Sequence, residues 1–120
     1  MTNNKISHFS IHDFFPNRFI RPSDVGPRDL LVTISRFDSE NLGRGDQKDL
    51  KLIIYFNETQ KGLPLNKTNA LTIAALYGDQ PDDWVGKQVI LYVTEVSFQG
   101  TLMDGIRIRK RVPEPSGPQS

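Results

Sequence analysis

The sequence of 120 residues contains no cysteine, which excludes disulfides, thiolate metal sites and a cysteine nucleophile. It also lacks any run approaching the roughly 20 apolar residues that a membrane helix needs. The first five residues are polar and do not begin the apolar core of a secretory signal. The length suits one domain, and 37% hydrophobic residues suffice for a buried core. We therefore expect a single intracellular globular domain.

An excess of one charge sign is missing as well, since the net charge is only +1. The charges are nevertheless unevenly spread. Residues 29–105 carry more acidic than basic side chains, whereas residues 106–112 contain Arg107, Arg109, Lys110 and Arg111 without an acid. A protein that binds DNA strongly and without sequence preference is usually basic over its whole domain. A polyanion would here have to meet a local basic strip.

Residue sets typical of active sites are absent too. His8 and His12 are four residues apart, but no further ligands accompany them. Asp79, Asp82 and Asp83 do not follow the ligand order of a calcium-binding loop. The sequence has neither a Walker phosphate-binding loop nor the G-x-S-x-G elbow of serine hydrolases. We therefore predict a non-enzymatic protein without a metal or a cofactor.

The two ends of the chain differ in composition from its centre. Residues 1–28 contain four of the seven phenylalanines and three prolines, which exclude a long helix and favour an arm that packs on the central domain. Residues 113–120 are proline-rich and lack a large apolar side chain, so they are predicted to form a flexible tail. The central domain is accordingly predicted at residues 29–112.

Period-two alternation of apolar and polar residues predicts strands in the central domain. The predicted strands are 30–37, 50–56, a short one at 62–65, 88–96 and 103–112. Pro64 cannot donate to a strand ladder, so the short strand should be an edge or carry a bulge.

One helix is predicted between the third and fourth strands. Asn66 or Thr68 can cap its start, and Gly78 is suited to its end. A single helical turn should follow at residues 81–84, where Trp84 would close one end of the core. The side chains predicted to form the buried stripe of the helix are Leu71, Ile73, Ala74 and Leu76.

This order of elements predicts a mainly β fold with one helix. The specific prediction is a five-stranded OB-type Greek-key barrel with the helix between strands 3 and 4. The alternative is an open five-stranded sheet with the helix packed on one face. The short, closely spaced and strongly alternating strands favour the barrel.

Four short motifs suggest relatives. They are LPLNKTNA at residues 63–70, YGD at 77–79, DWVGK at 83–87 and GIRIR at 105–109. Together they resemble a family of small, mostly uncharacterised bacterial and phage proteins with an OB-like fold, over roughly residues 17–109. The resemblance implies a role in DNA metabolism, in the cytoplasm of a bacterium or of a phage-infected cell. It implies no catalytic residues.

OB barrels bind oligonucleotides on one face, between the loop after strand 1 and the loop after strand 4. Cations in such sites follow the phosphate backbone, and aromatic rings stack on bases. We therefore predict binding of single-stranded nucleic acid through residues on outer strand faces and in these loops. The candidates are Phe37, at the end of the outer face of strand 1, and Arg44, Lys48, Lys51, Tyr55, Phe98, Arg107, Arg109 and Lys110.

The alternative function is a protein-interaction or assembly module. The aromatic arm could dock on a second copy or on another protein, and the edge strand at Pro64 could take a partner strand. The acidic balance of residues 29–105 favours this alternative. Salt-sensitive binding of single strands would distinguish the two functions.

Overall fold

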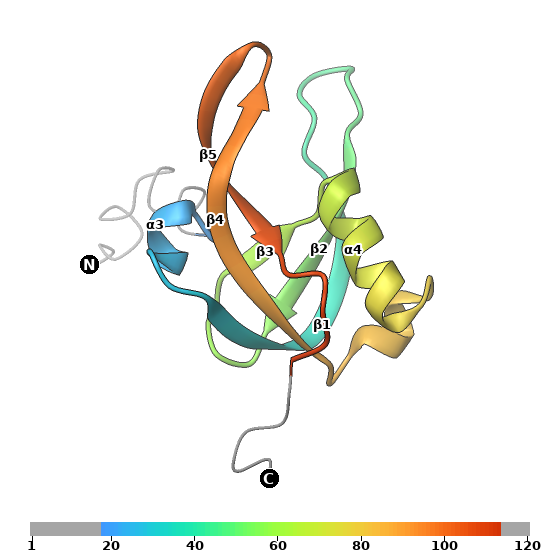
Figure 1. Cartoon of the computed structure of the whole chain (residues 1–120). Helices are drawn as coiled ribbons and strands as arrows, with labels where there is room; N and C mark the ends of the chain where they lie inside the picture. Colours follow the sequence, from blue (N-terminus) through green and yellow to red (C-terminus); the bar gives the residue numbers. More distant parts are fainter. Residues whose placement is uncertain (1–17, 114–120) are drawn as a thin grey trace, which may run out of the picture.

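The computed structural model describes residues 18–113. Five strands form one antiparallel sheet in the order β3-β2-β1-β4-β5 (Figure 1). The mainly β architecture with a helix between the third and fourth strands is therefore confirmed. The elements are α3 (Pro22–Val25), β1 (Leu30–Asn41), β2 (Leu50–Phe56), β3 (Gly62–Pro64), α4 (Lys67–Tyr77), the 3-10 turn η1 (Pro81–Trp84), β4 (Gln88–Phe98) and β5 (Thr101–Ile108).

The sheet is not closed into a barrel, so that part of the fold prediction is wrong. Closure would require β3 to pair with β5, but β3 has only three residues. Its outer edge bonds instead to the segment before α3, where the backbone N–H of Ile20 donates to the carbonyl of Gly62 at 2.9 Å. On the β5 side, the amide of Asn69 in α4 donates to the carbonyl of Ile106 at 3.0 Å. Other segments thus occupy both edges that would meet in a barrel.

The core lies on the inner side of the sheet. α4 contributes Ile73, η1 contributes Trp84, and the segment before β1 contributes Ile20 and Val25. Trp84 is only 3% exposed and belongs to the core cluster, and its Nε1 donates to the carbonyl of Gly78 at 2.8 Å. The buried residues that the strands contribute to the core cluster are Val32, Ile34, Ile54, Phe56, Leu63, Val89, Leu91, Ile106 and Ile108.

A β-bulge in β1 changes which side of the sheet its later residues face. The pairing of β1 with β2 shifts by one residue between Ile34 and Arg36, which leaves Ser35 as the extra residue. One extra residue exchanges the two sides of a strand. Phe37 therefore packs against the core, whereas Arg36 turns outward and lies over the ring of Tyr55. The predicted position of Phe37 on the outer face is wrong for this reason.

α4 begins and ends where the sequence predicts. Asn66 is its N-cap and accepts a hydrogen bond from the backbone N–H of Asn69 at 2.8 Å. Gly78 follows its last residue with a φ of 99°, in the region that favours glycine.

The buried side of α4 differs from the predicted apolar stripe. Ile73 is fully buried, but Leu71 is 58% exposed. Asn69 and Thr72 are buried in its place. The reason is that α4 meets the edge of β5, where the carbonyl of Ile106 needs a donor and Asn69 supplies it.

A tight turn joins β4 to β5. Its two residues, Gln99 and Gly100, have φ values of 54° and 81°. Such two-residue turns favour Asn-Gly, because asparagine tolerates a positive φ better than most residues.

We expect Gln99→Asn to raise the free energy of unfolding by part of the roughly 1–2 kcal/mol that this region costs an ordinary residue. Urea denaturation followed by circular dichroism measures the change. Gln99→Ala is the control and should give no gain. Equal stability of the two variants would contradict the prediction.

None of the helices within residues 18–113 combines the length and the hydrophobicity that a membrane-spanning segment requires.

Candidate nucleic-acid interface

The β4–β5 hairpin extends beyond the body of the molecule, beside the end where the β1–β2 loop also projects (Figure 1). Alternation along the hairpin places one row of residues on its outer side, opposite the core residues Leu91 and Ile106. Phe98 is 59% exposed and Met103 is 49% exposed in this row. We call the row the ribbon face, and it consists of Tyr92, Val96, Phe98, Met103, Arg107 and Arg109.

Arg109 has a fixed position on the ribbon face. Its Cζ lies 3.6 Å from the centroid of the Tyr92 ring. Its Nη2 and Nε donate to the two carboxylate oxygens of Asp29 at 2.9 and 3.2 Å. These hydrogen bonds lower the pKa of Asp29, which therefore stays ionised at neutral pH and holds the guanidinium in place. Arg109 and Tyr92 thus form a preorganised stack.

Arg107 is the less constrained cation of the ribbon face. It lies directly across from Tyr92 in the strand pairing. Its one hydrogen bond in the described structure is a long one of 3.4 Å to the carbonyl of Ile106, and no ion pair engages it there. Its charge is available to an anionic ligand.

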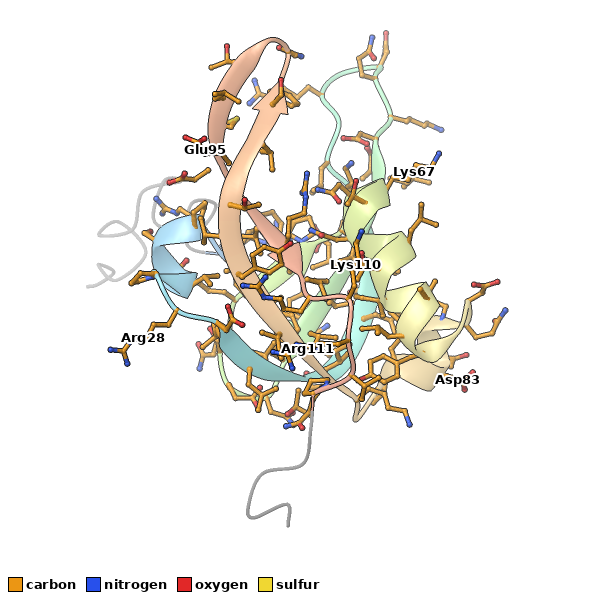
Figure 2. All side chains as sticks on the ribbon, viewed as in Figure 1. Arg28, Lys67, Asp83, Glu95, Lys110 and Arg111 are labelled. Atoms are coloured by element: carbon orange, nitrogen blue, oxygen red, sulfur yellow. The ribbon has the colours of Figure 1, made fainter. Side chains whose placement is uncertain are left out.

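Acidic side chains lie on the opposite side of the same hairpin. Glu95 and Asp104 are directly paired across β4 and β5, out of phase with Tyr92 and Arg107. Glu95 belongs to the projecting part of the hairpin (Figure 2). The hairpin is therefore cationic on one side and anionic on the other, which restricts a polyanion to the ribbon face.

A second group of cations and aromatic rings lies on the outer side of β1 and β2. The Cζ of Arg36 is 3.8 Å from the centroid of the Tyr55 ring. Arg18 covers the ring of Phe19 at 4.6 Å and donates to Glu40 at 2.6 Å, and this bond raises the pKa of Arg18.

The bulge in β1 lies beside a hollow of about 530 Å³. Arg36 and Tyr55 line it from the two strands, and Asn57, Glu58 and Gln60 line it from the loop between β2 and β3. The sequence-predicted residue Tyr55 thus belongs to a concave part of the surface.

The remaining candidates lie apart from these two groups. Arg44 and Lys48 are exposed in the β1–β2 loop, and Lys51 pairs with Asp49 at 3.8 Å. Lys110 follows β5 and lies beside α4 (Figure 2). There it lines a separate groove of about 460 Å³ together with Thr68, Leu71, Thr72, Ala75 and Leu76.

Sequence reasoning missed several residues of these groups, among them Arg36, Tyr92 and Met103. Arg36 was missed because a bulge cannot be read from alternation. Tyr92 and Met103 belong to predicted strands, but only the strand register shows that they lie beside Arg107 and Phe98. The Arg109–Tyr92 stack has no signal in the local sequence.

Comparisons with known proteins add no function. No protein-family model, curated protein or solved structure matches the chain. The resemblance to small bacterial and phage proteins therefore stays a prediction. Within residues 18–113, no three histidine, aspartate or glutamate side chains come together as metal ligands would. His8 and His12 lie outside the described residues, as do most of the predicted arm and tail.

Proposed function

We propose that this protein is a non-catalytic binding protein for single-stranded nucleic acid, with an open OB-type fold. The strand order and the place of α4 correspond to an OB barrel opened between β3 and β5. The ribbon face carries the proposal, because it combines an exposed aromatic ring, Phe98, with the cation Arg107 and the stack of Arg109 on Tyr92.

The chemistry of the ribbon face favours a single strand over a duplex. A phenylalanine ring stacks on the face of a base, which a duplex hides between its neighbours. The arginines contribute phosphate contacts and guanidinium planes on which a base can also stack. The predicted role in DNA metabolism makes DNA the first nucleic acid to test.

The proposal is tested by the fluorescence anisotropy of a labelled thymidine oligonucleotide at several salt concentrations. We expect binding whose logarithm falls linearly with the logarithm of salt concentration, with a slope of about 0.7 per phosphate contacted. Phe98→Ala should weaken binding roughly 5- to 150-fold, the usual effect of losing one stacked base. Arg107→Glu should weaken binding and flatten the salt slope by about one phosphate contact.

Lys87→Glu is the matched control for the charge reversal. Lys87 is exposed and precedes β4 at the end far from Phe98, so it changes the net charge equally without altering the ribbon face. A duplex of the same length should bind more weakly than the single strand. Absence of single-strand binding at low salt, or equal affinities of Phe98→Ala, Arg107→Glu and the unmodified protein, would contradict the proposal.

The alternative of an assembly module has less support from the described residues. The outer edge of β3, which was predicted to take a partner strand at Pro64, already bonds to Ile20 of the same chain at Gly62. The other predicted docking element, the aromatic arm, lies largely outside the described residues.

A further inference from the structure

One cation and one anion border the hollow beside the bulge. Arg36 borders it from β1, and Glu58 borders it from the loop between β2 and β3. The guanidinium of Arg36 stacks on the ring of Tyr55, with its Cζ 3.8 Å from the ring centroid. A ligand of the hollow must therefore satisfy a set of donors and a set of acceptors at once.

Arg36 keeps its hydrogen-bond donors available. Its side chain is 60% exposed, and its nearest acid, Asp38, is 4.0 Å away, at the limit of an ion pair. Stacking on Tyr55 fixes the plane of the guanidinium, which presents its donors as a rigid fork. This fork suits a ligand with two neighbouring acceptors.

Glu58 is held as an ionised acceptor. Its Oε1 accepts from the backbone N–H of Thr33 at 2.7 Å, and its Oε2 accepts from the Thr33 hydroxyl at 2.8 Å. Desolvation raises the pKa of Glu58, but the bonds from Thr33 outweigh it, and the pKa is lowered. A carboxylate offers about four acceptor positions, so both oxygens can still accept from a ligand.

The hollow and the ribbon face share one side of the sheet. Thr33, which holds Glu58, is paired with Gln88 at the start of β4, and the Gln88 amide donates to the Thr33 hydroxyl at 3.3 Å. Gln88 and Tyr92 are four residues apart on one strand, so they face the same way. A strand bound on the ribbon face can therefore continue toward the hollow without passing through the sheet.

From this arrangement we infer that the hollow binds a guanine base of the single strand. Guanine has two neighbouring acceptors, O6 and N7, which arginine contacts in bidentate fashion. Its adjacent edge has two neighbouring donors, the N1–H and the N2 amino group, for the acceptor positions that Thr33 leaves free on Glu58. Thymine lacks this pair of donors, and a phosphate would meet the negative charge of Glu58. The inference rests on the proposed function, because the base arrives as part of a bound strand.

The test compares three oligonucleotides that differ only at one central position, which is thymidine, guanosine or inosine. We expect the guanosine strand to bind roughly 5- to 150-fold more tightly than the thymidine strand, as a good bidentate contact provides. Inosine, which lacks the N2 amino group, should fall between the two. Arg36→Lys and Glu58→Gln should each bring the guanosine-to-thymidine affinity ratio close to one.

Glu95→Gln is the matched control, because it removes the same charge on the side of the hairpin away from the ribbon face, and it should keep the ratio. A titration of the unmodified protein with guanosine 5′-monophosphate, monitored by ¹H–¹⁵N NMR, distinguishes the two proposals. Shifts of the amide signals of residues 35–36 and 57–60, without binding of the thymidine strand, would support guanine binding in the hollow. The same result would reject single-strand binding by the ribbon face. Binding of the thymidine strand with a ratio of one and unmoved amides would overturn the guanine inference alone.

Discussion

Trp84→Ala is expected to lower the free energy of unfolding by about 3–5 kcal/mol, the usual effect of removing a large aromatic side chain from a core. Trp84 is 3% exposed and packs in the same cluster as Ile73 and Leu91. Its removal leaves a cavity at the end of the core where η1 meets the sheet, and it frees the carbonyl of Gly78. A small domain has about 5–15 kcal/mol of stability in total, so the variant should be close to unfolding at 37 °C.

Urea denaturation followed by far-ultraviolet circular dichroism measures this loss, because Trp84 is the single tryptophan and its fluorescence disappears with it. Trp84→Phe should lower the free energy of unfolding clearly less, because it keeps most of the apolar contact and loses only the hydrogen bond. Val85→Ala is the control, at a 47% exposed neighbour, and should change stability by no more than about 0.5 kcal/mol. A loss at Trp84→Ala as small as that at Val85→Ala would show that Trp84 does not support the core.

The elements that the sequence predicted well are those with a local cause. The strands follow from period-two alternation, and α4 follows from a capping asparagine, Asn66, and a terminal glycine, Gly78. Whether the edge strands β3 and β5 pair with each other has no local cause. Barrel closure depends on whether β3 meets β5. The edge of β3 is bonded instead to Ile20 and the edge of β5 to Asn69, and each of these residues lies far in the sequence from the edge that it contacts.

The residues of the candidate site show the same difference between features with a local cause in the sequence and features without one. Alternation correctly places Arg107 and Arg109 outside and Ile106 and Ile108 inside, because β5 is regular. It fails at Phe37, because one extra residue in β1 exchanges the sides of everything after it.

The bulge also explains why the hollow could not be predicted. Its cation, Arg36, would face the core in a regular strand, and its anion, Glu58, lies in a loop that alternation does not describe. The hydrogen bonds from Thr33 to Glu58 join positions 25 residues apart. Sites built by such contacts become visible only when the strand register is known.

Asn69 provides the sharpest test of the open sheet, because it is a polar side chain where the sequence predicts none. It is 2% exposed, its amide donates to the carbonyl of Ile106, and its Oδ1 is buried without a hydrogen-bond partner among the described residues. An unsatisfied buried oxygen costs about 1–3 kcal/mol. The donor that α4 brings to the β5 edge offsets this cost, because it gives the Ile106 carbonyl a hydrogen bond of 3.0 Å, shorter than the one of 3.4 Å from Arg107.

Asn69→Asp is therefore expected to lower the free energy of unfolding by about 3–5 kcal/mol at pH 7, because it leaves an ionised carboxylate buried against the Ile106 carbonyl. Only the protonated acid can donate to that carbonyl, so the folded state raises the pKa of the new side chain. The loss should be small below about pH 4, the ordinary pKa of aspartate, and should grow as the pH rises above it.

Asn66→Asp is the matched control, since it makes the same substitution three residues earlier in an exposed position. Its carboxylate can still accept from the backbone N–H of Asn69, at the end of α4 where the helix dipole favours a negative charge. Its stability at pH 7 should equal or exceed that of the unmodified protein. Urea denaturation of both variants from pH 3 to pH 8 measures the difference in the free energy of unfolding. If this free energy changed with pH in parallel for the two variants, Asn69 would not be the buried donor that α4 brings to the edge of β5.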